Sequence, residues 1–257
     1  MIVRLFIACL LIALSGCSSV RESMTDSVTG WFQDKDNAEP PAKLVDFNAS
    51  VSVSERWSAS VGSSSKKLYV RLQPKVDGDR IYAAGAKGRV SAYNVDSGQL
   101  LWQVDTGLPL RGGPGSGDGL VLLGTADAEL IALDRNSGAE RWRVKVSSEV
   151  LAAPSAAEGV AVVRSIDGRI YGFSSENGKR IWIHDSSVPV LTLRGTSAPV
   201  ITNGAVIAGL SNGKLVALLL KNGSRLWESR IAIPRGRSEL ERIVDIDADP
   251  IVANGVV

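Results

Sequence analysis

The segment LDRNSGAERW, Leu133–Trp142, decides the fold because its pattern recurs along the chain: a polar turn, a glycine, and a tryptophan four residues later. The other copies are YNVDSGQLLW, FSSENGKRIW and LLLKNGSRLW, which end at Trp102, Trp182 and Trp227. A proline stands 28 residues before each of these tryptophans, at Pro74, Pro114, Pro154 and Pro199. Internal repeats of this length indicate a solenoid, a propeller or a similar array.

One unit, Ala153–Asp185, shows what each repeat folds into. Short runs of β-forming residues alternate with turns at Glu158-Gly159, Asp167-Gly168 and Asn177-Gly178. Asp-Gly and Asn-Gly pairs are strong hairpin signals, and no helical period is present. The sequence therefore predicts an all-β fold, a β-propeller built from four-stranded antiparallel blades.

The recurring spacing of glycine and tryptophan within the chain has a structural interpretation. Glycine accepts the positive φ of a tight turn, and the tryptophan then fills the space between neighbouring blades. This packing role is favoured over stacking on a cofactor. A small residue stands six positions before each glycine, where we expect the blades to approach closely. These small residues are Ala92, Ala132, Gly172 and Ala217.

The N-terminus has the features of an export signal. Residues 1–16 combine an early Arg4 with a short apolar run and small residues, which is typical of a secretory signal peptide. Leu14–Cys17 resembles the lipobox of bacterial lipoproteins, in which the cysteine is lipidated; the alternative is an ordinary signal peptide that contains a cysteine. Ser18 in place of Asp implies, by the same resemblance, the outer membrane. Residues 17–45 are predicted to be a flexible tether and residues 46–257 the blades.

The repeat Ala132–Trp142, of the form A-x-D-x-x-S-G-x-x-x-W, resembles the tryptophan-docking repeat of eight-bladed quinoprotein-type propellers. Together with the lipobox it resembles the BamB family, propeller lipoproteins of the outer-membrane β-barrel assembly (Bam) machinery. Four complete units and the opening of a fifth do not make eight blades, so we expect a fragment that lacks its C-terminal blades. Trp57 has the context of a final strand, which in a closed ring would complete the last blade.

Two connectors between blades are longer than most, and such insertions on a fixed scaffold often form binding surfaces. In the BamB family the counterparts of five connector residues bind BamA, and this chain matches that pattern at Leu191, Leu193, Arg194, Asp245 and Asp247. The structural alternative is that the leucines are buried and that Arg194 pairs with Asp245 or Asp247.

The sequence contains no strong motif for binding nucleic acid, a metal ion or a phosphate group. With 29 basic and 27 acidic residues and no basic run, nucleic acid is an unexpected partner. The only two cysteines are Cys9 and Cys17, and the one histidine is His184, so no metal site is predicted. Asp245-x-Asp247-x-Asp249 begins like a calcium loop but lacks the required Gly and Glu. GGPGSGDG, residues 112–119, lacks the residues of a P-loop and is interpreted as a flexible connector.

Two functions remain in view. The leading one is a non-enzymatic scaffold without a cofactor, which binds BamA and the Bam complex and assists insertion of β-barrel proteins, with nascent outer-membrane proteins as further partners. The alternative is a periplasmic quinoprotein dehydrogenase that holds pyrroloquinoline quinone. Those enzymes usually carry an adjacent cysteine pair, which this chain lacks. A propeller that binds cell wall or carbohydrate has no support beyond the fold.

Overall fold

The computed structural model describes residues 43, 45, 50–62, 70, 72–195 and 197–257. The chain divides into two compact units, Met1–Val53 and Ser54–Val257, and all the described strands belong to the second. The predicted signal peptide, Cys17 and nearly all of the tether lie outside the described residues. Among the residues that are described, no helix is long and apolar enough to span a membrane.

In the described part of the chain, sixteen strands form four antiparallel sheets, and each sheet consists of four strands that are consecutive in the sequence. This arrangement confirms the predicted four-stranded blades, including the strands and turns assigned to Ala153–Asp185. The blades are β1 (Lys75–Asp77), β2 (Arg80–Ala84), β3 (Arg89–Asn94) and β4 (Leu100–Asp105); β5 (Leu110–Gly117), β6 (Leu120–Thr125), β7 (Glu129–Asp134) and β8 (Glu140–Lys145); β9 (Ser155–Ala157), β10 (Val160–Arg164), β11 (Arg169–Ser174) and β12 (Arg180–Asp185); and β13 (Val200–Thr202), β14 (Ala205–Gly209), β15 (Lys214–Leu219) and β16 (Arg225–Arg230).

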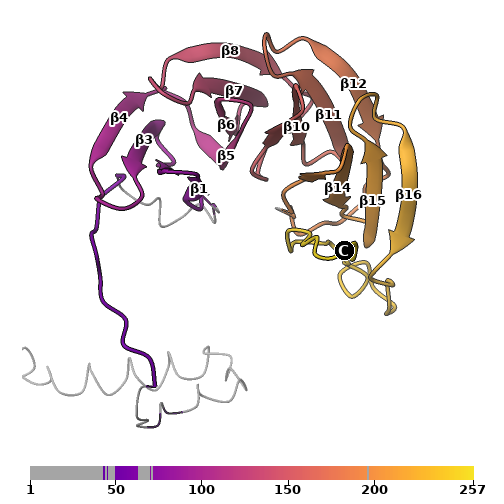
Figure 1. Cartoon of the computed structure of the whole chain (residues 1–257). Helices are drawn as coiled ribbons and strands as arrows, with labels where there is room; N and C mark the ends of the chain where they lie inside the picture. The colour runs from indigo at the N-terminus through magenta and orange to yellow at the C-terminus, as the bar shows by residue number, and fades with distance from the viewer. Residues whose placement is uncertain (1–42, 44, 46–49, 63–69, 71, 196) are drawn as a thin grey trace, which may run out of the picture. The chain divides into compact units, whose positions relative to one another are not determined.

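Within the unit Ser54–Val257, the sheets stand side by side in chain order as blades around a common centre (Figure 1). The first strands lie inside, where β5 contacts β1 and β9, and β9 contacts β13. The fourth strands, β4, β8, β12 and β16, lie on the outside. The hydrophobic core is divided accordingly: each of its three clusters joins two neighbouring blades.

Tryptophan docking joins one blade to the next. The indole of Trp102 on β4 covers Gly138 in the β7–β8 turn, and its Nε1 donates to the carbonyl of Arg135 at 2.9 Å. Trp142 and Trp182 repeat this contact on the following blades, and all three indoles are less than 10% exposed. The hydrogen bond matters because a buried indole N–H without a partner is costly. The prediction that the tryptophan packs against a neighbouring blade is confirmed for Trp102, Trp142 and Trp182.

Trp57 makes the same contact at the start of the unit. Its ring lies over Gly98 and its Nε1 donates to the carbonyl of Val95 at 2.9 Å. Residues 54–62 nevertheless form no strand. The docking contact therefore requires the tryptophan and the turn, and it does not require a neighbouring strand.

The small residues of the repeat have a more specific role than close approach of two blades. Ala132 is the cross-strand partner of Trp142, and Gly172 is the partner of Trp182. A Cβ at Gly172 would overlap the indole of Trp182. The small side chain makes room for the tryptophan of its own blade, which can then reach the next one.

The glycine-rich segment is not the flexible connector that its composition suggested. Residues 112–117 belong to β5, which pairs with β6. A Cβ at Gly115 would overlap the carbonyl of Pro154, and a Cβ at Gly117 would overlap that of Ala156. The glycines are needed because two inner strands pass each other at backbone distance.

The turn before each tryptophan is held by a side chain. Asp134 Oδ1 accepts hydrogen bonds from the backbone N–H groups of Asn136 and Ser137, both at 3.0 Å, and from the Ser137 hydroxyl. These hydrogen bonds to Ser137 and Asn136 lower the pKa of Asp134 below its ordinary value of 3.8. In the first blade, Asn94 accepts the equivalent bonds.

The docking contact can be tested with two glycines of nearly equal φ. Gly138 (φ 73°) lies under Trp102, and a Cβ there would be 2.6 Å from the indole, whereas Gly119 (φ 74°) has open space around it. We expect Gly138→Ala to lower the free energy of unfolding by about 1–3 kcal/mol more than Gly119→Ala does. Denaturant unfolding of the two variants measures the difference, and equal losses would show that only backbone strain matters.

The turn carboxylate should make stability depend on pH. Because the pKa of Asp134 is lowered on folding, its contribution is present above pH 3.8 and is lost as the pH falls through the folded-state pKa. Asp134→Asn keeps an oxygen acceptor, as Asn94 does, but cannot titrate. We expect the stability difference between wild type and Asp134→Asn to change across this pH window in chemical denaturation. Asn94→Asp should gain the dependence that Asp134→Asn loses.

Candidate functional site

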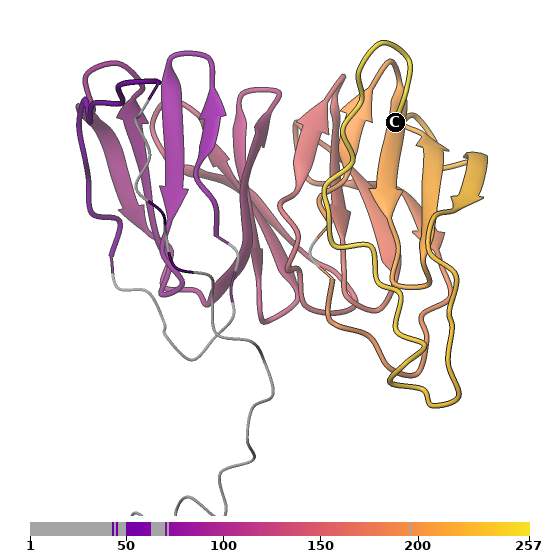
Figure 2. The same cartoon turned by 90° about the horizontal axis from the view of Figure 1, so that it is seen from below.

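The two long connectors emerge at one end of the blades. Residues 186–199 follow β12 and residues 231–249 follow β16. Ser186 donates its backbone N–H to Gly168, and Ile231 donates to Gly213, so both connectors begin beside the turns between second and third strands. Figure 2 shows them, in orange and yellow, extending beyond the same end of the sheets. The fourth blade separates these connectors in the sequence, and the fold brings them to one face.

Apolar side chains are exposed on this face. Leu191 is 45% exposed and Leu193 is 64% exposed. Ile231, Ile233 and Leu240 of the second connector are exposed as well. Exposed apolar side chains that gather on one face are typical of a protein-binding surface. The alternative in which the leucines are buried is therefore wrong.

Arg194 lies beside the leucines with its backbone in the left-handed region, at φ 60°. Its exposed guanidinium pairs with Glu149, in the connector between β8 and β9. Asp245, one of the two partners expected for Arg194 in the structural alternative, has no hydrogen-bond partner among the described residues. Glu149 is thus an additional member of the site, and it was missed because nothing in its local sequence marks it.

Asp245 and Asp247 approach the same loop from the other connector. A Cβ on Gly195, the residue after Arg194, would lie 2.8 Å from Asp247 Oδ1 and 3.5 Å from Asp245 Oδ1. Asp247 is exposed, but both carboxylate oxygens of Asp245 are buried and lack a hydrogen-bond partner among the described residues. The two connectors that carry the five predicted residues therefore meet at Gly195, and the two aspartates lie in different environments.

Arg164, at the end of β10, is a buried charged residue of the neighbouring blade. Its side chain is only 3% exposed, and Nη2 donates to Ser211 Oγ at 2.9 Å. Burial lowers the pKa of Arg164, and the negative charges of Asp245 and Asp247 oppose that shift. The repeat held a signal for this residue, since the corresponding positions of the other blades carry only small residues. These are Ala84, Gly124 and Gly209.

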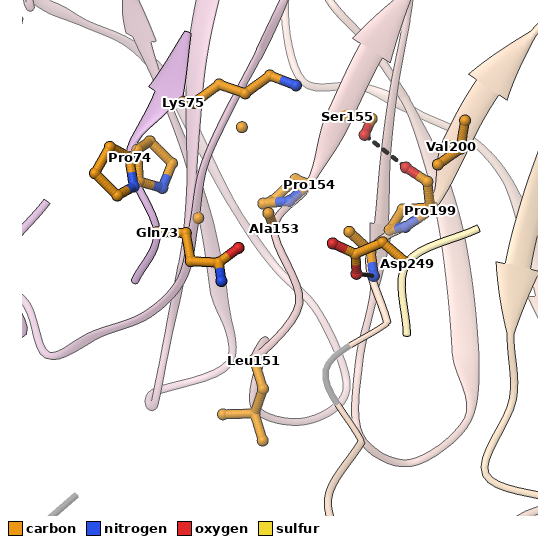
Figure 3. A pocket seen from close by; sticks show the side chains of 14 residues that line it. Gln73, Pro74, Lys75, Leu151, Ala153, Pro154, Ser155, Pro199, Val200 and Asp249 are labelled. Atoms are coloured by element: carbon orange, nitrogen blue, oxygen red, sulfur yellow. Dashed lines mark hydrogen bonds between the residues drawn. The ribbon is translucent and has the colours of Figure 1, made fainter. Parts of the chain in front are cut away.

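A separate hollow of about 250 Å³ lies where the first strands of the blades converge (Figure 3). All four repeat prolines line it, and its only charged side chains are Lys75 and Asp249. Asp249 accepts a hydrogen bond from the backbone N–H of Ala198 at 2.8 Å, which directs it to the neighbouring connector. In the described part of the chain no three His, Cys, Asp or Glu side chains are grouped as metal ligands.

The single histidine, His184, lies neither on the two long connectors nor in the lining of the hollow. His184 is half-buried on β12, and burial followed by the positive charge of Arg225 lowers its pKa. It is therefore neutral near pH 7, which suits a structural position on the outer strand.

These features define a class: a β-propeller whose blades are joined by tryptophan docking of the quinoprotein type, with long connectors gathered on one face. The family model described as "Outer membrane protein assembly factor BamB" matches residues 39–107 and 86–257. The chain belongs to the BamB family.

Individual relatives agree with this assignment. BamB of Pseudomonas aeruginosa is 57% identical over 86% of this chain and 58% of its own length. BamB of Legionella pneumophila is 45% identical over 99% of this chain and 64% of its own length. The crystal structure of BamB from Moraxella catarrhalis matches with a TM-score of 0.67 and 30% identity, over 73% of this chain and 57% of the other. The chain thus spans roughly three fifths of these relatives.

Proposed function

We propose that this chain belongs to a non-enzymatic scaffold that binds BamA and, within the Bam complex, assists the assembly and insertion of β-barrel proteins into the outer membrane. Membership of the BamB family supports the proposal. The observation that carries it is the grouping of exposed Leu191 and Leu193 with Arg194, next to the aspartate-bearing connector.

The composition of this surface suits a protein partner. Leucine side chains supply apolar anchors, whereas Arg194 and Asp247 can form charge-assisted hydrogen bonds at their edge. Glu149 holds the Arg194 guanidinium in place before the partner arrives, which reduces the entropy lost on binding. The hollow between the first strands is lined mostly by proline, glycine and small residues.

The proposal includes the location. Lipidation of Cys17 after removal of residues 1–16 anchors the protein in the outer membrane, and the tether of residues 17–45 lets the blades face the periplasm. Nascent outer-membrane proteins are a second class of partner, which the scaffold receives while it is bound to BamA.

The partner surface is tested by affinity capture from detergent-solubilised outer membranes. We expect Leu191→Ala, Leu193→Ala and Arg194→Ala each to weaken recovery of BamA, by about tenfold or more if the residue is a binding hot spot. Leu100→Ala is the matched control, because Leu100 on β4 is 49% exposed and lies away from the connectors. Equal recovery with all four variants would place the interface elsewhere. Failure of the wild type to recover any barrel protein would contradict the scaffold function.

The anchor is tested separately. We expect Cys17→Ala to move the protein from the membrane fraction to the soluble periplasmic fraction, because the lipidated cysteine is the proposed attachment point. Fractionation measures this, and mass spectrometry of the mature N-terminus identifies the acyl chains. An unmodified N-terminus beyond Cys17 in the wild type would contradict lipidation.

A further inference from the structure

A buried arginine lies under the proposed partner surface, and neither the propeller fold nor the surface itself explains it. Arg164 ends β10 with its side chain almost completely enclosed. One of its nitrogens donates to Ser211, whereas Nε and Nη1 are buried without a partner among the described residues. A charge in such surroundings is costly unless an opposite charge is near.

The opposite charge comes from the connector of residues 231–249. Asp245 supplies two buried carboxylate oxygens that likewise lack a hydrogen-bond partner in the described chain. The negative charges of Asp245 and Asp247 oppose the lowering of the Arg164 pKa by burial. Both groups lie beside the same short segment, since Arg164 Nη2 donates to Ser211 and Ile246, next to Asp245, donates to the adjacent Leu210. Unsatisfied donors and unsatisfied acceptors are therefore buried in one region.

The backbone around Asp245 is held from both sides. Ile246 donates its N–H to the carbonyl of Leu210 at 3.2 Å, and its side chain packs against Gly209. Ser197, from the other connector, is buried at the same glycine. Both connectors thus meet over the fourth blade, close to the end of β10 in the third.

We propose that Arg164 is a positioning residue for the partner surface: with Asp245 it forms a buried electrostatic pair that holds the segment Val244–Ala248 against Gly195. This fixes the loop that presents Leu193 and Arg194. Asp245 then acts on binding from beneath the surface, because its carboxylate is inaccessible to a partner. Asp247, by contrast, is exposed at the surface. The inference rests on the proposed function in that it assigns the surface to BamA.

The geometry makes the loop sensitive to this support. Arg194 already adopts a left-handed backbone conformation, which a non-glycine residue keeps only where its surroundings hold it. Gly195 is buried against the two aspartates, so movement of Val244–Ala248 removes one wall of the loop. A change at Arg164 is therefore transmitted to side chains that it does not touch.

The test compares Arg164→Met, Asp245→Asn and the double variant in the intact, membrane-anchored protein. We expect each single change to weaken BamA binding by about tenfold, a size typical of residues that act on a site without contacting the ligand. We expect the double variant to bind much like the single ones, because the two residues act as a pair. Arg164→Lys, which keeps the charge, should recover part of the affinity.

Hydrogen exchange supplies a readout that general destabilisation does not reproduce. In Arg164→Met and Asp245→Asn, the amides of Leu191–Gly195 and Val244–Ala248 should exchange faster, while those of β10 and β11 stay protected. Arg169→Met is the matched control: Arg169 is also on the third blade but is half-exposed and pairs with Asp185 at 2.7 Å. It should change neither exchange in these loops nor BamA binding.

The outcomes distinguish the positioning role of Arg164 from the proposed binding of BamA. Additive losses in the double variant, or unchanged exchange in both loops, would overturn the role of Arg164. If the wild type fails to bind BamA, the proposed function falls, whereas coupled changes in loop exchange would still establish the link between Arg164 and Asp245. If Arg164→Met does not fold, the isosteric Asp245→Asn variant decides by the same two measurements.

Discussion

The contact between a tryptophan and the glycine turn of the next blade is the constraint on which the rest of the fold depends. A blade alone buries only one face, and the core clusters form only where two blades meet. The indole provides a large apolar area and one hydrogen bond whose acceptor is always the carbonyl three residues before the glycine. Because the contact uses so few residues, the connectors between blades are free to vary in length.

This freedom is what makes a binding face feasible. The connectors after β12 and β16 are long, yet the third and fourth blades from which they emerge keep the same strand pattern as the others. Their loops carry exposed leucines and an arginine, while the charges of Arg164 and Asp245 lie beneath. In the proposed arrangement, the surface is supported by these buried charges, which stand on the blades.

Much of the blade structure could be predicted from the sequence, since Gly178, Trp182 and their counterparts carry local turn chemistry that recurs. Other features depended on contacts between distant segments. The glycines of β5 looked flexible because composition does not reveal that the next inner strand passes at backbone distance. Arg164 stood out only as a large residue among Ala84, Gly124 and Gly209, and Asp245, whose charge opposes the effect of burial on the Arg164 pKa, lies on a connector whose path no local pattern predicts.

The direction of the docking contact has a consequence for how such a chain matures. Each tryptophan precedes in the sequence the turn that covers it, as Trp142 precedes Gly178. A polypeptide that emerges from its N-terminal end therefore always displays one uncovered indole, at the last blade to have formed. Trp227, which no later blade covers in the described chain, is 40% exposed, whereas Trp102, Trp142 and Trp182 are less than 10% exposed. Each new blade covers the indole of the preceding blade and exposes its own. Premature association through an exposed tryptophan is therefore confined to the last folded blade.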